Sequence, residues 1–317
     1  MTPDSRRYLP PEALARIGHL ELRARAVVEG VLAGLHKSPY RGQSVEFLQH
    51  REYVRGDDLR RVDWKVWARQ DRLYVKEFEE ETNLRLTLVV DCSASMDYRG
   101  LGAALSKYEC ASTVAASLAW LALSHGDAVG CAAFDDRVRA AVPARPSRSH
   151  LASIVSVLAA PRGRGDHPAE ATSLLPVLRS LAESLPRRGL VIIVSDLLGD
   201  RDGLVPGLRR LRARDHDVAL LHVLDDDELD FPFEGPTRFE GLEFAEEIAC
   251  NPRAFRAGYL EALEQFLAAT RQQVAALGCD YELVRSREPA AGPLVRVLMI
   301  MLLLLLLLHL LLRLLRL

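Results

Sequence analysis

An apolar run at residues 84–90 ends at an aspartate, and two serines follow it at alternate positions, giving Asp91-x-Ser93-x-Ser95. A buried strand that ends in this way brings a carboxylate and two hydroxyl groups to one edge of a sheet. Hard oxygen groups of this kind are the ligands that Mg²⁺ and Mn²⁺ prefer. The pattern therefore indicates a metal site, if other parts of the chain bring further oxygen groups to the same edge.

Two other loops offer such groups. An aspartate directly follows the apolar run at 190–195, and a threonine precedes a segment of helical periodicity at 173–185. In a sheet of parallel strands, ligands bind at the carboxyl ends of the strands, where the strand order reverses. Ser173 is an alternative to the threonine. The candidate metal ligands are thus two carboxylates and three hydroxyls from three loops: Asp91, Ser93, Ser95, Thr172 and Asp196.

The chemistry of this ligand set suggests a partner. Neutral hydroxyls do not cancel the charge of a metal ion, so the metal keeps a strongly electrophilic face and several waters. Such a face accepts an acidic side chain from a partner protein. The residue types leave open whether Asp91 and Asp196 bind the metal directly or hold its waters.

From residue 84 onwards, short apolar segments alternate with segments of helical periodicity. This alternation predicts parallel strands joined by right-handed helical crossovers, with a hairpin at 127–142 as an antiparallel edge. The predicted fold is therefore α/β, with a doubly wound, mostly parallel sheet. The expected strands are at 84–91, 127–134, 137–142, 190–195, 217–224 and 280–284, and the expected helices at 103–125, 149–159, 173–185, 203–213 and 253–277.

The first 82 residues differ in character from this alternating part. A helical apolar pattern covers residues 10–34, and residues 37–82 are dense in charged and aromatic side chains. Alternation at 73–78 predicts a strand. We expect a helix followed by a small β-rich lobe with salt-bridged surface loops. The alternative interpretation is a recognition surface beside the sheet edge.

Composition limits the partners and the compartment. The chain has 317 residues with 41 Lys and Arg against 43 Asp and Glu, so no basic field attracts nucleic acid. The five cysteines form no zinc-binding spacing, and an odd number without a framework suits a reducing compartment. The N-terminus has no apolar signal core. A cytoplasmic protein that does not bind nucleic acid is expected.

Several enzyme classes lack their motifs here. A haloacid-dehalogenase phosphatase needs Asp-x-Asp, and Ser93 occupies the second position. The chain has no Gly-x-Ser-x-Gly elbow, no P-loop and no His-Glu-x-x-His. A non-enzymatic role is therefore expected. Two alternatives stay open: a hydrolase acting on phosphoryl or acyl groups through the same metal, and a vestigial metal site with the contact surface at residues 51–69, around Arg60 and Arg61.

Two resemblances follow from these motifs. The five candidate ligands resemble the metal-ion-dependent adhesion site of von Willebrand factor A-type domains, which uses Asp-x-Ser-x-Ser, a threonine, and an aspartate after the fourth strand. More narrowly, REYVRGDDLRRVDWKVWAR at 51–69, VKEFEEE at 75–81 and the Asp91-x-Ser93-x-Ser95 loop resemble the bacterial domain-of-unknown-function family 58. This resemblance extends over nearly the whole chain, up to Val284. Thr172 departs from the pattern, because Glu and Ala precede it instead of a glycine pair.

The resemblance implies more than the residues do by themselves. It implies a Rossmann-like sheet of the von Willebrand factor A type, with Mg²⁺ or Mn²⁺ bound at the five residues. Family members are often encoded beside MoxR-type AAA+ ATPases. The resemblance therefore implies metal-dependent binding of a protein partner in chaperone-like assembly or maturation, with a MoxR-type ATPase as the partner machine.

The C-terminal end is a separate feature. Val297–Leu312 reads VLMIMLLLLLLLHLLL, with His309 as its one polar side chain. As a helix it would span about 24 Å, against roughly 30 Å for a bilayer core. It is interpreted as a membrane anchor, as a helix buried against a partner or a second copy, or as a low-complexity end without a selected role. The expected domains are 1–82 (helix and lobe), 83–287 (von Willebrand factor A-like) and 288–317 (apolar tail).

Overall fold

A computed structural model of the protein describes residues 19–36, 50–52, 74–76, 84–160, 174–199, 202–242 and 247–299. The chain splits into two compact units, Met1–Leu35 with Leu84–Leu317, and His36–Asn83. In the smaller unit, β1 (His50–Glu52) pairs antiparallel with β2 (Tyr74–Lys76). The strand predicted at 73–78 is thereby confirmed, and the charged block around Arg60 and Arg61 lies outside the described residues.

A six-stranded sheet forms the centre of the larger unit, in the order β10-β7-β6-β3-β4-β5. Neighbouring strands are parallel except β4 and β5, which form an antiparallel pair at one edge. The predicted α/β fold with a mostly parallel sheet and an antiparallel edge is confirmed. The strands are β3 (Arg85–Asp91), β4 (Ala128–Phe134), β5 (Val138–Arg145), β6 (Gly189–Ser195), β7 (His216–Leu224) and β10 (Asp280–Arg285).

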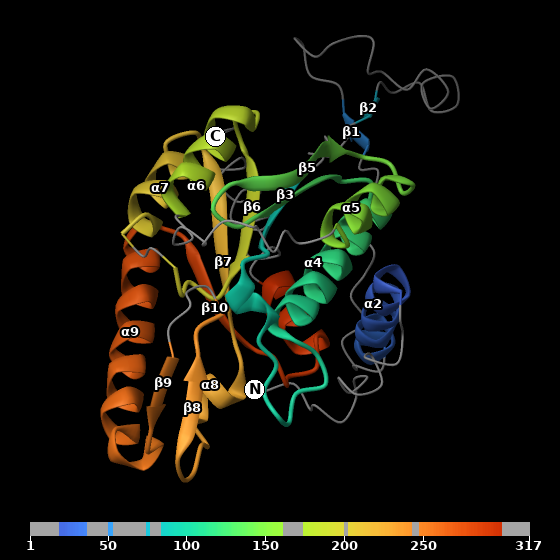
Figure 1. Ribbon diagram of the computed structural model, residues 1–317. Coiled ribbons are helices and arrows are strands. Elements are labelled where there is room, and N and C mark those ends of the chain that lie inside the picture. The colour runs from blue at the N-terminus through green and yellow to red at the C-terminus, as the bar shows by residue number, and fades with distance from the viewer. Residues whose placement is uncertain are drawn as a thin grey trace. The chain divides into compact units, whose positions relative to one another are not determined.

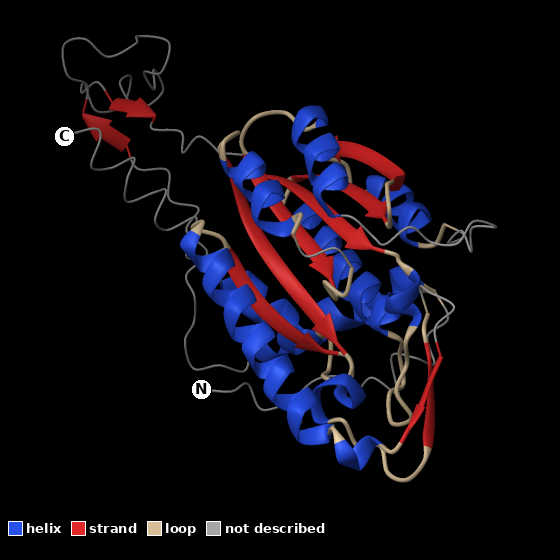
Figure 2. Ribbon diagram, turned by 60° about the vertical axis from the view of Figure 1, so that its left-hand side comes forward, coloured by secondary structure: helices blue, strands red, loops and turns tan. Residues whose placement is uncertain are grey.

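Helices cover both faces of this sheet, as Figures 1 and 2 show. Successive strand residues point to opposite faces, so β3 places Leu86 and Leu88 in one core and Val89 in the other. Burial on both faces explains why the strands read as nearly continuous apolar runs. The first core lies against α4 (Lys107–Ser124) and α5 (His150–Leu158), and the second against α6 (Leu174–Ser184), α7 (Leu204–Arg212) and α9 (Arg256–Ala276).

The N-terminal helix α2 (Leu20–His36) belongs to the larger unit and packs beside α4. Ala24 and Val27 are buried in the first core, and the Ser117 hydroxyl of α4 donates to the Ala24 carbonyl at 3.5 Å. The Arg25 guanidinium stacks 4.3 Å from the centre of the Trp120 ring. The sequence pattern grouped this helix with the lobe that follows it. In the structure its apolar face packs instead on α4, where it becomes part of the first core.

The chain continues beyond β10 as a helical segment at 291–299 that packs on the first core. Leu294 and Val297 are completely buried there. The Arg296 guanidinium donates to the Glu288 carboxylate at 2.8 Å. The expected tail thus begins as part of the folded unit, and most of its apolar run lies outside the described residues. None of the helices in the described part of the chain is long and apolar enough to cross a membrane.

This packing predicts where the chain can be shortened. A chain that ends at Arg287 loses Leu294 and Val297 from the core, and burial of each aliphatic side chain is worth roughly 1.5–3 kcal/mol. We therefore expect its free energy of unfolding to fall by roughly 3–6 kcal/mol. A chain that ends at Met299 keeps both side chains and is expected to unfold like the full chain. Urea unfolding followed by circular dichroism compares the two truncations, and equal midpoints contradict the expectation.

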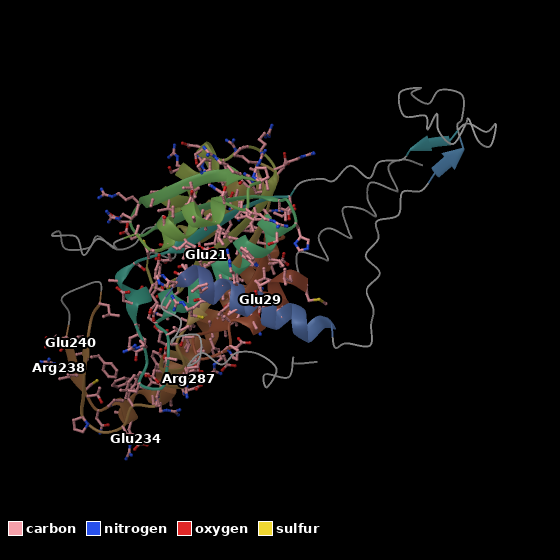
Figure 3. The ribbon with its side chains drawn as sticks, turned by 90° about the vertical axis from the view of Figure 1, so that its right-hand side faces the viewer. Glu21, Glu29, Glu234, Arg238, Glu240 and Arg287 are labelled. Atoms are coloured by element: carbon pink, nitrogen blue, oxygen red, sulfur yellow. The ribbon has the colours of Figure 1, made fainter. Side chains whose placement is uncertain are left out.

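Residues 226–252, where the sequence pattern predicted no strand or helix, contain regular structure. They form α8 (Asp226–Asp230) and an antiparallel hairpin of β8 (Thr237–Glu240) and β9 (Glu247–Cys250). The Phe231 ring centre lies 4.4 Å from that of Tyr259 on α9, so aromatic packing fixes the base of the hairpin. The strands are too short for a periodicity to stand out. Figure 3 shows the charged side chains that surround this hairpin, Glu234, Arg238 and Glu240.

Candidate metal centre

The topology creates one place where the sheet edge opens. β3 and β6 are parallel neighbours, with Val90 opposite Val194. After β3 the chain continues to β4 on one side, and after β6 it continues to β7 on the other side. The connections therefore diverge at the carboxyl ends of β3 and β6, which is the switch point where α/β sheets bind ligands. Asp91 is the last residue of β3, and Ser195 is the last residue of β6.

Asp91 is fixed by two neutral donors. Its Oδ1 accepts from the Ser93 backbone N–H at 2.9 Å, and its Oδ2 accepts from the Ser195 hydroxyl at 2.6 Å. The first contact is the local turn that an aspartate forms with the backbone two residues on. It directs the chain into the short 3₁₀ helix η3 (Ala94–Asp97). The second contact joins the ends of two strands, so the carboxylate has one defined orientation.

The two serine hydroxyls of the motif face each other. Ser93 Oγ and Ser95 Oγ are 3.1 Å apart, and both side chains are buried. Adjacent ligands of an octahedral Mg²⁺ at 2.0–2.1 Å are themselves about 3 Å apart. The pair therefore has the spacing that such an ion requires. No group of three His, Cys, Asp or Glu side chains within the described ranges has metal-binding geometry, so the metal hypothesis depends on these hydroxyls.

The charge of Asp91 is poorly compensated by the residues that the structure describes. Burial, and after it the negative charge of Asp196, together raise the pKa of Asp91 to about 7. The hydrogen bonds from Ser195 and Ser93 act in the opposite direction but do not outweigh burial. A cation beside Asp91 would offset this cost. The donor set and the charge of the site therefore fit a hard divalent cation.

Asp196 lies at the same edge but in a different environment. Its Oδ2 accepts from the Lys107 ammonium at 2.8 Å, and its Oδ1 accepts from the Leu198 N–H at 3.1 Å. Its backbone carbonyl accepts from the His222 ring at 2.9 Å. Leu197 holds a left-handed φ of 55°, which costs about 1–2 kcal/mol for a branched residue and turns the following N–H back toward the carboxylate. Asp196 is therefore held on three sides.

Lys107 is the residue that the sequence-based prediction missed. It has no solvent exposure, and its ammonium donates at 2.8 Å to Asp196 and at 2.6 Å to Glu228 of α8. Burial disfavours its charge, but the two carboxylates outweigh burial and raise the pKa of Lys107. Burial also raises the pKa of Glu228. With two carboxylates in contact, we assign Lys107 as charged.

A local signal for Lys107 does exist in the sequence. Ser106 and Glu109 form a capping box, in which Ser106 Oγ accepts from the Glu109 N–H at 3.2 Å. This motif makes Lys107 the first residue of α4. A cation in the first turn of a helix is opposed by the helix dipole. A lysine at this position therefore indicates nearby carboxylates, although not which ones.

The loop that follows the serine motif is fixed to α8. The Gly100 N–H donates to Asp225 Oδ2 at 3.3 Å, and the Tyr98 hydroxyl donates to Asp227 Oδ2 at 3.3 Å. A Cβ at Gly100 would lie 2.3 Å from Asp225 Oδ1, so this close approach requires glycine. The loop therefore follows one path over the carboxyl ends of β3 and β7.

A pocket adjoins the centre on the α9 side. Its volume is about 160 Å³, and Asp91 and Ser195 are among the polar residues that line it. Leu197, Phe266 and Thr270 are among the other lining residues. A ligand at the sheet edge therefore has both polar and apolar surface within reach.

The structure brings together most of the predicted site. Asp91, Ser93 and Ser95 share one hydrogen-bonded cluster, and Asp196 lies close enough for its charge to act on Asp91. Thr172 and its alternative Ser173 lie outside the described residues. The prediction did not include Lys107 and Glu228, nor the contact that Ser195 makes with Asp91.

The fold and the site together define the structural class of the protein. This is an α/β protein with a mostly parallel sheet, and buried oxygen groups are clustered at its switch point. The chain belongs to the DUF58 family, whose model, described as a protein of unknown function, matches residues 49–268.

Relatives are found in mycobacteria. The uncharacterized protein Mb1516 of Mycobacterium bovis is 32% identical over 286 residues, which cover 87% of this chain and 85% of that protein. The uncharacterized protein Rv1480 of Mycobacterium tuberculosis gives the same values.

Among solved structures, the conserved hypothetical protein BatB from Bacteroides thetaiotaomicron is 17% identical, with a TM-score of 0.39, over 67% of this chain and 97% of that chain. An aerotolerance-related membrane protein from Bacteroides fragilis, solved with multiple mutations to serines, is 17% identical, with a TM-score of 0.41, over the same shares.

Proposed function

We propose that the protein is a non-enzymatic protein-interaction module of the von Willebrand factor A type, which uses a bound Mg²⁺ or Mn²⁺ to hold an acidic side chain of a partner protein. One observation carries the proposal. Two buried serine hydroxyls lie 3.1 Å apart beside Asp91, a buried carboxylate whose hydrogen-bond donors among the described residues are neutral. This arrangement has the oxygen chemistry of a magnesium site and the uncompensated charge that a cation would offset.

Each residue has a defined task in this proposal. Ser93 and Ser95 supply neutral oxygens, and Asp91 supplies the negative charge. Thr172 and Asp196 complete the set in the way the family resemblance implies. When bound, the metal supplies a positively charged face that accepts a carboxylate. Ser195 keeps Asp91 in place by donating to its Oδ2.

The partner that the resemblance implies is a MoxR-type AAA+ ATPase, in chaperone-like assembly or maturation. A contact made through the metal predicts that the complex of the two proteins dissociates in EDTA and re-forms when Mg²⁺ is added. Size-exclusion chromatography of the mixture measures this directly. A complex that persists in EDTA would show that another surface, such as residues 51–69, makes the contact.

A metal-dependent hydrolase is the second candidate, and the pKa of Asp91 favours it. A carboxyl group with a pKa of about 7 beside a pocket has the properties of a general base. Generic phosphatase and esterase substrates distinguish the two candidates. Turnover that requires Mg²⁺ and is abolished in Asp91→Ala supports the hydrolase and contradicts the non-enzymatic proposal.

The metal itself is tested by calorimetric titration of Mg²⁺. We expect saturable binding to the wild type, and at least roughly tenfold weaker binding to Ser93→Ala/Ser95→Ala, because two of about six oxygen ligands are removed. The chain offers a matched control. Ser147 and Ser149 have the same spacing, with their Oγ atoms 2.8 Å apart at an exposed position.

The variant Ser147→Ala/Ser149→Ala is expected to bind Mg²⁺ like the wild type. Equal affinities in all three proteins, or binding by none of them, contradict the metal proposal.

A further inference from the structure

We infer that Lys107 is a positioning residue of the metal centre. It is an internal counter-cation that keeps Asp196 out of direct contact with the metal, so that Asp196 acts on the ion only through water. The inference rests on the proposed metal site and specifies how the protein arranges the charges of that site. It distinguishes the two carboxylates, which the sequence leaves equivalent, by the groups that contact them.

The first argument is that the two carboxylates contact groups of different charge. Within the described part of the chain, the donors to Asp91 are the Ser93 N–H and the Ser195 hydroxyl, which are both neutral. Asp196, in contrast, is in contact at 2.8 Å with an ammonium group. Two cations that share one buried carboxylate repel each other strongly at low dielectric. A metal ion is therefore better placed on Asp91 and the serines than on Asp196.

The second argument is that Asp196 cannot easily turn away from Lys107. Its other carboxylate oxygen accepts from the Leu198 N–H at 3.1 Å, and its carbonyl accepts from His222 Nε2 at 2.9 Å. The His222 ring is itself fixed, because its Nδ1 lies 2.8 Å from the Tyr281 hydroxyl. The side chain and the backbone of Asp196 are thus both held.

The third argument is that Lys107 itself is held from the far side. Its ammonium also contacts Glu228 at 2.6 Å, and Glu228 is tied to the N-terminus of α8 by accepting from the Asp225 N–H at 2.7 Å. The side chain of Lys107 extends from the first turn of α4, where the helix dipole opposes a cation. A charged lysine at such a position needs carboxylates in contact with it, and Lys107 contacts Asp196 and Glu228.

The functional consequence concerns the open positions of the metal. Ser93 and Ser95, with Asp91 beside them, would hold a hard cation that keeps several of its waters. If Lys107 keeps Asp196 outside, one more water remains for a partner carboxylate to displace.

The test uses Mn²⁺ and the full chain. Water-proton relaxation measures how many exchangeable waters the bound Mn²⁺ retains, and its titration gives the affinity. The variant Lys107→Met/Glu228→Gln keeps the total charge of the cluster while it frees Asp196. We expect the number of bound waters to fall by about one, and Mn²⁺ to bind about tenfold more tightly, as Asp196 becomes a direct ligand.

The single variant Glu228→Gln is the matched control. It keeps the contact between Lys107 and Asp196, so its Mn²⁺ is expected to retain the wild-type number of waters. Lys107→Gln, which removes the charge with a smaller change in shape, replaces the double variant if that variant does not fold, and is expected to shift both measurements in the same direction.

The outcomes distinguish the role of Lys107 from the existence of the metal site. Wild-type hydration and affinity in the charge-matched variant overturn the role of Lys107 and leave the metal site intact. Absence of Mn²⁺ binding by the wild-type protein overturns the metal site, and the role of Lys107 with it.

Discussion

Replacement of Lys107 with methionine is expected to lower the free energy of unfolding by roughly 3–5 kcal/mol, the cost of removing one partner from a buried ion pair. Methionine fills much of the same volume, so the loss is electrostatic. The reason is that Asp196 and Glu228 keep their charges without the ammonium that lies 2.8 and 2.6 Å away. Chemical unfolding in metal-free buffer at pH 8 measures the change.

An exposed ion pair provides the control for this prediction. Arg179 and Glu183 are 3.2 Å apart, and each side chain is 62% exposed. Arg179→Met is expected to change stability by less than about 0.5 kcal/mol, because surface pairs are screened by water.

The double variant Lys107→Met/Glu228→Gln removes one of the two uncompensated charges, so it is expected to be more stable than Lys107→Met alone. A loss below about 1 kcal/mol in Lys107→Met would show that the cluster is well solvated.

Replacement of Asp91 with asparagine is expected to stabilise the metal-free protein at pH 8 while it abolishes the response to Mg²⁺. Asparagine can keep both contacts, since its oxygen accepts from the Ser93 N–H and its amide can donate to Ser195 Oγ. What it removes is a buried charge. We expect a gain of up to about 4 kcal/mol at pH 8, because the pKa of Asp91 is raised to about 7 from its ordinary value of 3.8.

The pH dependence of this gain has a definite direction. The pKa of Asp91 is about 7 in the folded protein, above its ordinary value of 3.8, so the folded state binds a proton more tightly than the unfolded state. The metal-free wild type therefore loses stability as the pH rises from about 4 to about 7, and does not lose more above that range. The advantage of Asp91→Asn is expected to be small at pH 4 and to reach its full size near pH 7.

Thermal unfolding at several pH values, with EDTA and with Mg²⁺, tests both parts of the prediction. Mg²⁺ is expected to raise the Tm of the wild type and to leave that of Asp91→Asn unchanged. Asp217→Asn is the control, because Asp217 is 54% exposed and pairs with Arg212 at the surface. A lower stability of Asp91→Asn at pH 8 would mean that the protein compensates the charge of Asp91 without a metal.

Local patterns predicted most of the sheet and its helices. The apolar runs at 84–90 and 190–195 became β3 and β6, because strands buried on both faces need continuous apolar residues. Elements whose residues show no clear periodicity were not predicted. The four-residue strands β8 and β9 are too short to alternate visibly, and the helix at 291–299 has Gly292 and Pro293 in its first turn, which ordinarily indicate a break in a helix.

The serine motif belongs to the part of the site that sequence alone determines. Asp91, Ser93 and Ser95 lie within five residues, so one strand end and one turn are enough to place their oxygens together. The parallel pairing of β3 with β6 then places Asp196, the residue after β6, at the same edge.

Only the tertiary structure decided how the charges of that site are paired. Lys107 is 89 positions from Asp196 and 121 positions from Glu228, and no local rule relates residues so far apart. Which carboxylate receives a buried ammonium depends on how α4, β6 and α8 pack. The sequence therefore determined that oxygen groups meet at the switch point, and the packing of three distant elements decided that the buried ammonium of Lys107 pairs with Asp196 and Glu228.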